Sequence, residues 1–343
     1  MKNGEKMDGR LRNNNFDMLR MIFAGMVVLF HIAFVSQVPA LHGLTFISST
    51  FAVQAFFFVS GFLVTMSCER TSTLGRYFEK RFRRILPAYL VVIFASAFGL
   101  SILSDFGLWQ YFSSAEFFRY VGFNSILSNF TAPSLPGVFS NNPDHSVNGS
   151  LWTIKIEVAF YCLVPVLVFL IKRFGYSKVL LSAFFLSLLW RLGFEALADY
   201  YASDFFAKLA KQLPGQLSFF AGGALSYYRT RDGKKSPPAW AAFCSIAIYW
   251  IADGLIYWIV APFAVTLIVY WAAMSAPRMW SPAKYGDFSY GLYLYHFPIA
   301  QVFVTLNLFD DRPWFGVVGV VFFALLVSIF SWFFVEKRFL KTH

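Results

Sequence analysis

Two ionisable side chains lie within one long apolar segment near the start of the chain. Residues 17–37 (DMLRMIFAGMVVLFHIAFVSQ) hold Arg20 near their start and His31 well inside. In a helix this spacing is about three turns plus roughly 20°, so both side chains leave the same face, about 16 Å apart. Ionisable groups in a bilayer-spanning segment face protein or water and mark candidate functional sites. His31 is therefore a candidate general base and Arg20 a candidate anion ligand. Alternatively, Arg20 snorkels and His31 only hydrogen-bonds to another helix.

A basic cluster precedes the third apolar stretch. Within EKRFRRILPAY, four cations lie within about one and a half helical turns: Lys80, Arg81, Arg83 and Arg84. Guanidinium groups bind phosphate bidentately, so the cluster is a candidate site for a phosphate-bearing ligand. Alternatively, it sets the membrane topology and binds anionic lipid headgroups.

A polar stripe follows the longest polar stretch of the chain. On a helix capped by Ser150, one face carries residues three or four positions apart: Ser150, Thr153, Glu157 and Tyr161. Glu157 lies about two turns below the membrane surface, where a carboxylate is costly in lipid and so faces a polar interior. Trp152 and Lys155 point to the other side, near the outer interface. Glu157 is thus a candidate for orienting a reactant, the alternative being a structural ion pair.

A second polar face occurs near the end of the chain. In YGDFSYGLYLYHFPI, the residues Ser289, Tyr293 and His296 share a helix face at spacings of four and three. His296 reaches about the middle of the membrane, as His31 does. We expect Ser289, Tyr290 and His296 to line a cavity, and a direct catalytic role for them stays open.

Ser60 precedes Gly61 inside an aromatic run of the second apolar stretch. Its hydroxyl is a candidate cavity group. Alternatively, the small pair lets two helices approach closely. The packing interpretation is favoured because no general base stands beside Ser60 and a G-x-S-x-G elbow is absent.

The composition is that of a membrane protein. The chain has 343 residues, of which 58% are hydrophobic, 21% aromatic and only 14% charged, whereas a soluble domain carries about 25% charged residues. We predict an all-α, polytopic integral membrane protein with about ten transmembrane helices in a single domain, 1–343. The expected spans lie near residues 17–37, 47–68, 86–104, 150–171, 178–197, 213–228, 239–254, 255–275, 286–306 and 314–335.

The distribution of charge predicts the orientation. Most of the 29 lysines and arginines fall in the segments between spans on one side. The positive-inside rule therefore places both termini in the cytoplasm, with a cytoplasmic tail at 1–16 and the longest extracytoplasmic loop at 104–149. The net charge of +11 follows from this bias. No basic stripe with exposed aromatics is found in a soluble segment, so we exclude a nucleic-acid partner.

The cysteines give no sign of a metal centre. Cys68, Cys162 and Cys244 lie in separate apolar stretches without metal-ligand or C-x-x-C spacing. We expect no disulfide, no metal and no bound cofactor.

Taken together, these segments resemble the acyltransferase-3 family of integral-membrane O-acyltransferases. The matching elements follow the family's order over nearly the whole chain: residues 20–31, 56–63, 80–89, 150–165, 288–299 and the closing Ser331-Trp332 with Glu336. The resemblance implies ten spans, a multi-pass protein of the bacterial inner membrane, and functional roles for Arg20 and His31. Two departures matter. Lys337-Arg338 follow Glu336 where many relatives have a proline nearby, which leaves the role of Glu336 open. We also expect no extracytoplasmic hydrolase-like domain of the kind that some relatives append.

The resemblance also implies the reaction. We expect an acyl group, commonly acetyl among the relatives, to move from cytosolic acyl-CoA to a hydroxyl of a cell-surface carbohydrate or its lipid-linked precursor. Acyl-CoA would then be a donor substrate whose phosphates contact Arg20 and the basic cluster. His31 would be the base, with Glu157 orienting it or the acceptor, although a covalent acyl-imidazole stays open. The alternatives are a transporter or flippase with an intramembrane Arg/His/Glu relay and a non-catalytic scaffold.

Overall fold

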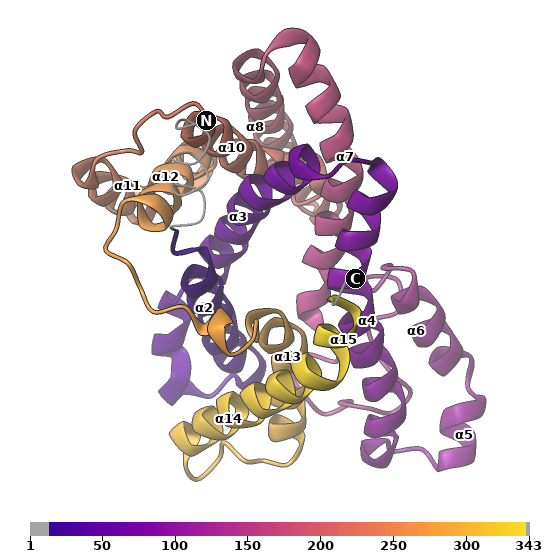
Figure 1. Ribbon diagram of the computed structural model, residues 1–343. Coiled ribbons are helices and arrows are strands. Elements are labelled where there is room, and N and C mark those ends of the chain that lie inside the picture. The colour runs from indigo at the N-terminus through magenta and orange to yellow at the C-terminus, as the bar shows by residue number, and fades with distance from the viewer. Residues whose placement is uncertain (1–13, 341–343) are drawn as a thin grey trace. The chain divides into compact units, whose positions relative to one another are not determined.

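The computed structural model describes residues 14–340, and within that range the chain is helical and forms no strand (Figure 1). The predicted all-α class is therefore confirmed. Apart from 14–16, the predicted tail at 1–16 lies outside the described residues.

Seven helical segments among the described residues are long and apolar enough to cross a membrane. They are Phe16–Ser36, Pro39–Arg70, Leu74–Leu103, Gly149–Phe174, Tyr176–Tyr201, Gly254–Met274 and Pro313–Leu340. Three further expected spans are helices that are shorter or less apolar: α10 (Leu213–Arg231), α11 (Ala239–Ile251) and α13 (Ser289–Thr305). The count of about ten and the cytoplasmic termini therefore stay predictions.

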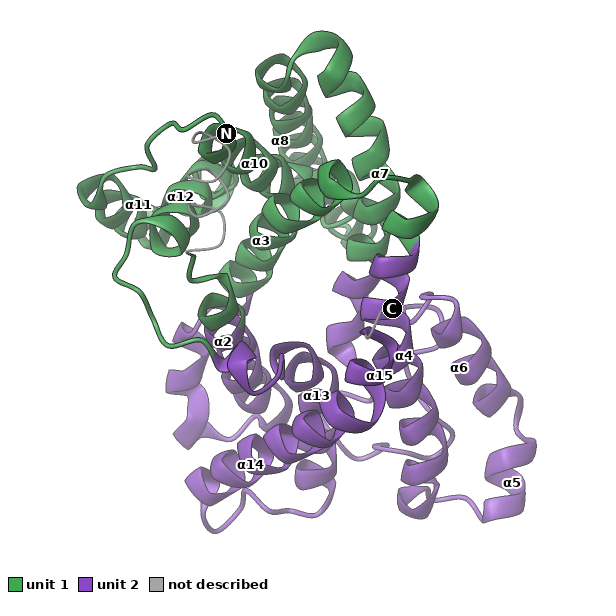
Figure 2. Ribbon diagram, in the orientation of Figure 1, with its two compact units in different colours: residues 1–20, 50–78, 156–281 green, residues 21–49, 79–155, 282–343 purple. Residues whose placement is uncertain are grey.

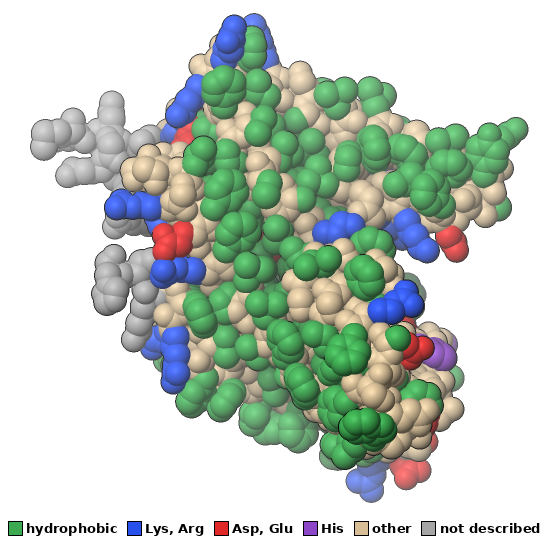
Figure 3. Space-filling view, turned by 90° about the vertical axis from the view of Figure 1, so that its right-hand side faces the viewer, with side chains coloured by type: hydrophobic (Ala, Val, Ile, Leu, Met, Phe, Trp, Pro, Cys, Tyr) green, Lys and Arg blue, Asp and Glu red, His purple; other side chains and the backbone are tan. Residues whose placement is uncertain are grey.

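The exterior is suited to lipid. Hydrophobic side chains, in green, are spread over the face that Figure 3 shows, among polar side chains and backbone in tan. Large side chains such as Phe169, Leu189 and Phe330 are exposed on the long helices. Exposed apolar area of this extent on a folded protein is covered by lipid or by another protein.

The chain forms two compact units, coloured separately in Figure 2. Among residues 14–340, unit 1 contains 14–20, 50–78 and 156–281, and unit 2 contains 21–49, 79–155 and 282–340. Unit 1 thus holds α3 (Ser49–Arg70), α8 (Tyr176–Tyr201), α9 (Asp204–Ala210), α10, α11 and α12 (Gly254–Met274) almost entirely. Unit 2 holds α5 (Leu108–Ser113), α6 (Ala115–Ser125), α13, α14 (Pro313–Ser331) and α15 (Lys337–Leu340). Helices α2 (Phe16–Ser36), α4 (Leu74–Gly99) and α7 (Trp152–Phe174) contribute to both.

In unit 1, helices α3 and α10 approach closely at two glycines. A Cβ on Gly61 would lie 2.0 Å from the carbonyl oxygen of Phe220, and one on Gly223 would lie 1.9 Å from that of Phe58. The contact is reciprocal, with each glycine facing the backbone of the other helix. This confirms the packing interpretation of the Ser60-Gly61 pair.

Replacing Gly223 with alanine should destabilise unit 1. The added methyl would clash with backbone that cannot rotate away, so we expect a loss of at least about 1–3 kcal/mol, seen as a lower melting temperature in detergent. Gly193 in α8 is the matched control, because a Cβ there meets nothing within 4 Å. Gly193→Ala should be neutral or stabilise by up to about 1 kcal/mol. Equal melting temperatures for the two variants would contradict the close contact.

In unit 2, residues 104–149 form the short helices α5 and α6 and a segment held against α13. The Gln301 side chain donates from Nε2 to the carbonyl oxygens of Asp144 and Ser146, both at 2.7 Å. Its Oε1 accepts from Nδ2 of Asn142 at 2.7 Å. Gln301 is completely buried. The buried amide of Gln301 thus hydrogen-bonds to three residues of this segment. These hydrogen bonds hold the segment beside the second half of α13.

Candidate functional site

His31 and His296, which the sequence places in two predicted spans, are in contact in unit 2. Nδ1 of His31 on α2 lies 2.8 Å from Nε2 of His296 on α13, and the rings are nearly parallel, with an 8° interplanar angle. The helix-face pattern placed each histidine near mid-membrane without pairing them. Helix α2 is unbroken from Phe16 to Ser36, so Arg20 keeps its predicted helical spacing from His31.

The ring of His31 is packed between aromatic side chains. Phe30 and Phe297 meet it nearly edge-on, at centroid distances of 5.7 and 5.2 Å. His31 is only partly buried, whereas His296 is 0% exposed. Nε2 of His31 makes no hydrogen bond to any residue between 14 and 340. This nitrogen is therefore the one that can meet a reactant.

Ser150 is used in packing against α13. The cap predicted at Ser150 is wrong, because the short 3₁₀ helix Gly149–Leu151 precedes α7 and Asn148 caps it. Asn148 accepts from the Ser150 hydroxyl at 2.6 Å and donates to the carbonyl of Leu294 at 2.8 Å. Tyr293 donates to the Ser150 carbonyl at 3.0 Å and shares a hydrogen bond with the Thr153 hydroxyl at 2.6 Å. The predicted polar faces of the two segments thus meet at Tyr293.

Trp152 and Lys155 lie near this contact in the sequence, but within the described residues no hydrogen bond links them to α13. Trp152 is the first residue of α7 and is partly exposed. The ammonium of Lys155 lies 4.4 Å from the centroid of the Phe130 ring, a cation–π contact. The ammonium of Lys155 is therefore placed against an aromatic ring and not against Glu157.

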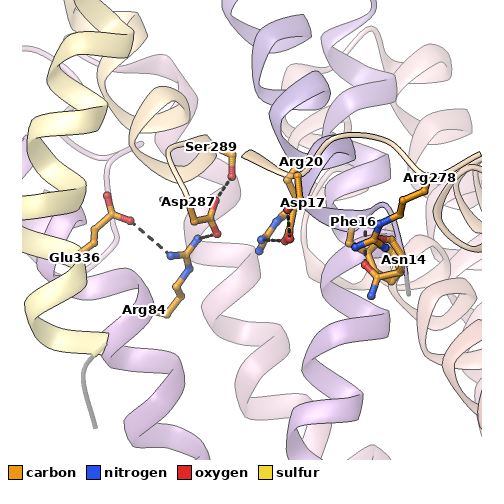
Figure 4. A network of polar contacts seen from close by, with 10 residues as sticks. Asn14, Phe16, Asp17, Arg20, Arg84, Arg278, Asp287, Ser289 and Glu336 are labelled. Carbon is orange, nitrogen blue, oxygen red and sulfur yellow. Dashed lines mark hydrogen bonds and ion pairs between the residues drawn. The ribbon is translucent and has the colours of Figure 1, made fainter. Parts of the chain in front are cut away.

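Arg84 lies between two carboxylates in unit 2, as Figure 4 shows. Its guanidinium is 2.5 Å from Oδ2 of Asp287 and 3.6 Å from Oε2 of Glu336. Ser289 donates its hydroxyl to the other oxygen of Asp287 at 2.6 Å. Tyr290 covers the guanidinium at 5.6 Å and donates to the Ile85 carbonyl at 3.0 Å. The predicted cavity residues Ser289 and Tyr290 thus belong to the surroundings of Arg84.

Glu336 is placed by a local change of helix type. Residues Trp332–Glu336 form a π-helical turn between α14 and α15, a feature that often marks functional sites. The side chain of Glu336 is 2% exposed and accepts from the Ser331 hydroxyl at 3.3 Å. Ser331 in turn accepts from the Tyr295 hydroxyl at 3.1 Å. Glu336 therefore lies in a buried network with Arg84, Ser331 and Tyr295.

The members of the basic cluster differ in their surroundings. Lys80 is exposed and Arg81 is partly buried. Arg83 pairs with Glu79 one helical turn earlier, at 2.6 Å, and both side chains are well exposed. Arg84, in contrast, points into unit 2 toward Asp287 and Glu336. The sequence pattern did not distinguish Arg84 from its neighbours.

The remaining candidates lie in unit 1. Arg20 pairs with Asp17 at 2.8 Å (Figure 4). Asp17 also accepts from the Ser281 hydroxyl at 3.0 Å. Glu157 accepts from the Tyr161 hydroxyl at 2.6 Å, so the inner part of the predicted stripe is a hydrogen-bonded pair. The hydroxyl of Ser60 is buried and has no hydrogen-bond partner among residues 14–340.

Three groups of the site were not singled out from the sequence: Asp287, Asn148 and the carbonyl of Leu292, whose oxygen lies 3.0 Å from Nδ1 of His296. Asp287 had a usable signal, because it lies two residues before Ser289 at the start of a helix. Within 14–340, no group of three or more His, Cys, Asp or Glu side chains could hold a metal ion. All three cysteines are free thiols.

Known proteins resemble this chain over nearly its full length. The model of the acyltransferase-3 family, described as an acyltransferase domain, matches residues 13–335. A Shigella phage Sf6 protein named O-acetyl transferase is 28% identical, with 96% of each chain covered. Nodulation protein 10 of Rhizobium leguminosarum bv. viciae is also 28% identical, over 96% of this chain and 93% of its own. No solved structure matches.

Proposed function

The chain belongs to the acyltransferase-3 family, and from this premise we propose that it transfers an acyl group from acyl-CoA to a hydroxyl of a cell-surface carbohydrate or its lipid-linked precursor. Family membership and the seven apolar helical segments make it a multi-pass membrane protein of an acyltransferase family. The proposed location is the bacterial inner membrane. The proposed cargo is acetyl, which the name of the phage relative supports.

One observation supports the proposal most directly. The imidazole of His31 lies in an apolar helix, and among the described residues it is hydrogen-bonded at one ring nitrogen but not at the other. His31 is held at Nδ1 by His296, and Nε2 makes no hydrogen bond within residues 14–340. Acyl transfer to a hydroxyl needs a base at this kind of position, because the hydroxyl must lose its proton as it attacks. A general base of this type contributes about 10²–10⁴-fold to the rate.

The proposed reaction is a direct transfer. The acceptor oxygen attacks the thioester carbonyl, a C–O bond forms, and the hydroxyl proton passes to Nε2 of His31. The C–S bond then breaks, and His31 returns the proton to the leaving sulfur, giving the ester and the free thiol of CoA. Transfer through an acyl-imidazole at the same nitrogen is the second possible route. Mass spectrometry of the intact protein after incubation with acetyl-CoA alone distinguishes the two.

We propose that the donor's phosphates bind near the start of α4, at Lys80 and Arg81. Replacing both with glutamine should raise the KM for acyl-CoA by about 10²-fold or more, because each of the two charge-assisted contacts is worth about 1.5–3 kcal/mol. The kcat should change little. Lys172→Gln, an exposed cation in the last turn of α7, is the matched control. An unchanged KM in the double variant would assign the cluster to topology and lipid contacts. Roles for Arg20 and Glu157 stay predictions from the sequence.

The function is tested with the full chain in proteoliposomes supplied with labelled acetyl-CoA and an extract of surface glycans. We expect label to appear in an ester on the glycan, with equimolar free CoA. Mass spectrometry of glycans from cells with and without the protein identifies the acceptor. Solute flux without acyl-CoA consumption would instead support the transporter alternative.

A further inference from the structure

His296 is held at both ring nitrogens. It lies on α13, is 0% exposed, and its Nδ1 is 3.0 Å from the carbonyl oxygen of Leu292, one helical turn earlier. Its Nε2 is the atom that meets Nδ1 of His31 at 2.8 Å. A buried imidazole with two defined partners has a fixed orientation, and the partners also decide where its proton resides.

The partners of His296 determine the tautomer of both rings. A backbone carbonyl can only accept, so Nδ1 of His296 must carry a hydrogen and donate to Leu292. In a neutral ring Nε2 of His296 is then unprotonated and can only accept. The hydrogen shared with His31 must therefore belong to Nδ1 of His31. This leaves Nε2 of His31 without a hydrogen, as a free lone pair.

We propose that His296 is a positioning residue that holds His31 in the Nδ1–H tautomer, so that Nε2 is the atom that accepts the acceptor's proton. The inference rests on the proposed acyl transfer. The Leu292 carbonyl, His296 and His31 form a chain in which each member sets the hydrogen position of the next. In hydrolase triads a carboxylate has this role, because it holds the catalytic histidine in one tautomer and one orientation.

The arrangement also suits the protonated state of His31. When Nε2 takes the hydroxyl proton, Nδ1–H of His31 still donates to the lone pair of His296. No hydrogen bond is broken during the step, and the aromatic packing of Phe30 and Phe297 keeps the ring in place. Without His296, the neutral ring would lose the acceptor that selects one tautomer, and a fraction of the protein would present Nε2–H to the substrate.

Two variants of His296 separate positioning from packing. In glutamine the terminal amide lies near the position of Nε2, so its oxygen can accept from His31. In asparagine the amide lies near Nδ1 and keeps the contact with Leu292 while losing His31. We expect His296→Gln to keep kcat within about tenfold, and His296→Asn to lower kcat by about 10²-fold with an unchanged KM for acyl-CoA. Both should melt at similar temperatures. Equal activity of the two variants would overturn the proposal.

The tautomer can be measured without any substrate. Ring ¹⁵N shifts distinguish protonated from unprotonated imidazole nitrogens, and the chain has five histidines. The signals of His31 are those absent from the His31→Asn protein. We expect a protonated Nδ1 and an unprotonated Nε2 in the wild type, and a mixture in His296→Asn. A protonated Nε2 in the wild type would overturn the inference.

The outcomes also distinguish this inference from the proposed function. If His31→Ala is inactive and His296→Asn is fully active, only the positioning role fails. If acyl transfer does not depend on His31 at all, the proposed function loses its base, whatever the tautomer measurement shows.

Discussion

Replacing His31 with alanine is expected to lower kcat for acyl transfer by about 10²–10⁴-fold, the usual contribution of a general base. The KM for acyl-CoA should change little. The variant also loses the ring contacts with His296, Phe30 and Phe297, so its melting temperature should fall and is measured beside the rate. The rate is measured in proteoliposomes as free CoA released per protein. A loss in kcat alone identifies an interaction made in the transition state.

A second histidine gives the matched control. His42 lies in the short helix Pro39–Phe46 of the same unit and is exposed, and His42→Ala should transfer acyl groups normally. Added imidazole should partly restore the His31→Ala enzyme, because the small base can occupy the vacated space. Wild-type rates in His31→Ala with the fold intact would remove the base assignment.

The sequence pattern was informative for features that depend on the geometry of a single helix. The spacing of Arg20 and His31 on one continuous helix follows from the 3.6-residue period and the length of the apolar run. The same reasoning placed His296 at mid-depth on another helix. It also identified the Ser60-Gly61 pair as a packing contact, because small residues in an aromatic run have few other uses.

The contacts between helices could not be predicted in the same way. A helical period shows which residues share a face, but it does not show which helix that face meets or at what height. The pairing of His31 with His296 depends on the packing of α2 against α13, and sequence distance gives no measure of it.

The number of spans was also difficult to predict. Helix α11 has 13 residues, fewer than the roughly 20 that a span needs, and apolar runs of that length also occur in buried helices.

Arg84 is the clearest case in which neighbours in sequence have different surroundings. Replacing Arg84 with alanine is expected to destabilise the protein by about 3–5 kcal/mol, because the carboxylates of Asp287 and Glu336 would lose their shared counter-charge in a buried site. The side chain of Glu336 is 2% exposed and that of Asp287 is 15% exposed, so solvent screens the two carboxylates only weakly. The melting temperature in detergent should fall, and the π-helical turn that holds Glu336 should be lost first.

Arg83 is the matched control, one residue earlier on the same helix. The side chains of Arg83 and of its partner Glu79 are 40% and 48% exposed, so Arg83→Ala should cost only about 0.2–1 kcal/mol.

A triple variant, Arg84→Met with Asp287→Asn and Glu336→Gln, tests the physical cause, because it removes the charges together. Replacing all members of a buried ion cluster is often nearly neutral, so this variant should recover most of the stability lost in Arg84→Ala. If the triple variant melts as low as the single one, the loss comes from packing of the Arg84 side chain beneath Tyr290. If Arg84→Ala is as stable as Arg83→Ala and only the KM for acyl-CoA rises, Arg84 belongs to the donor site.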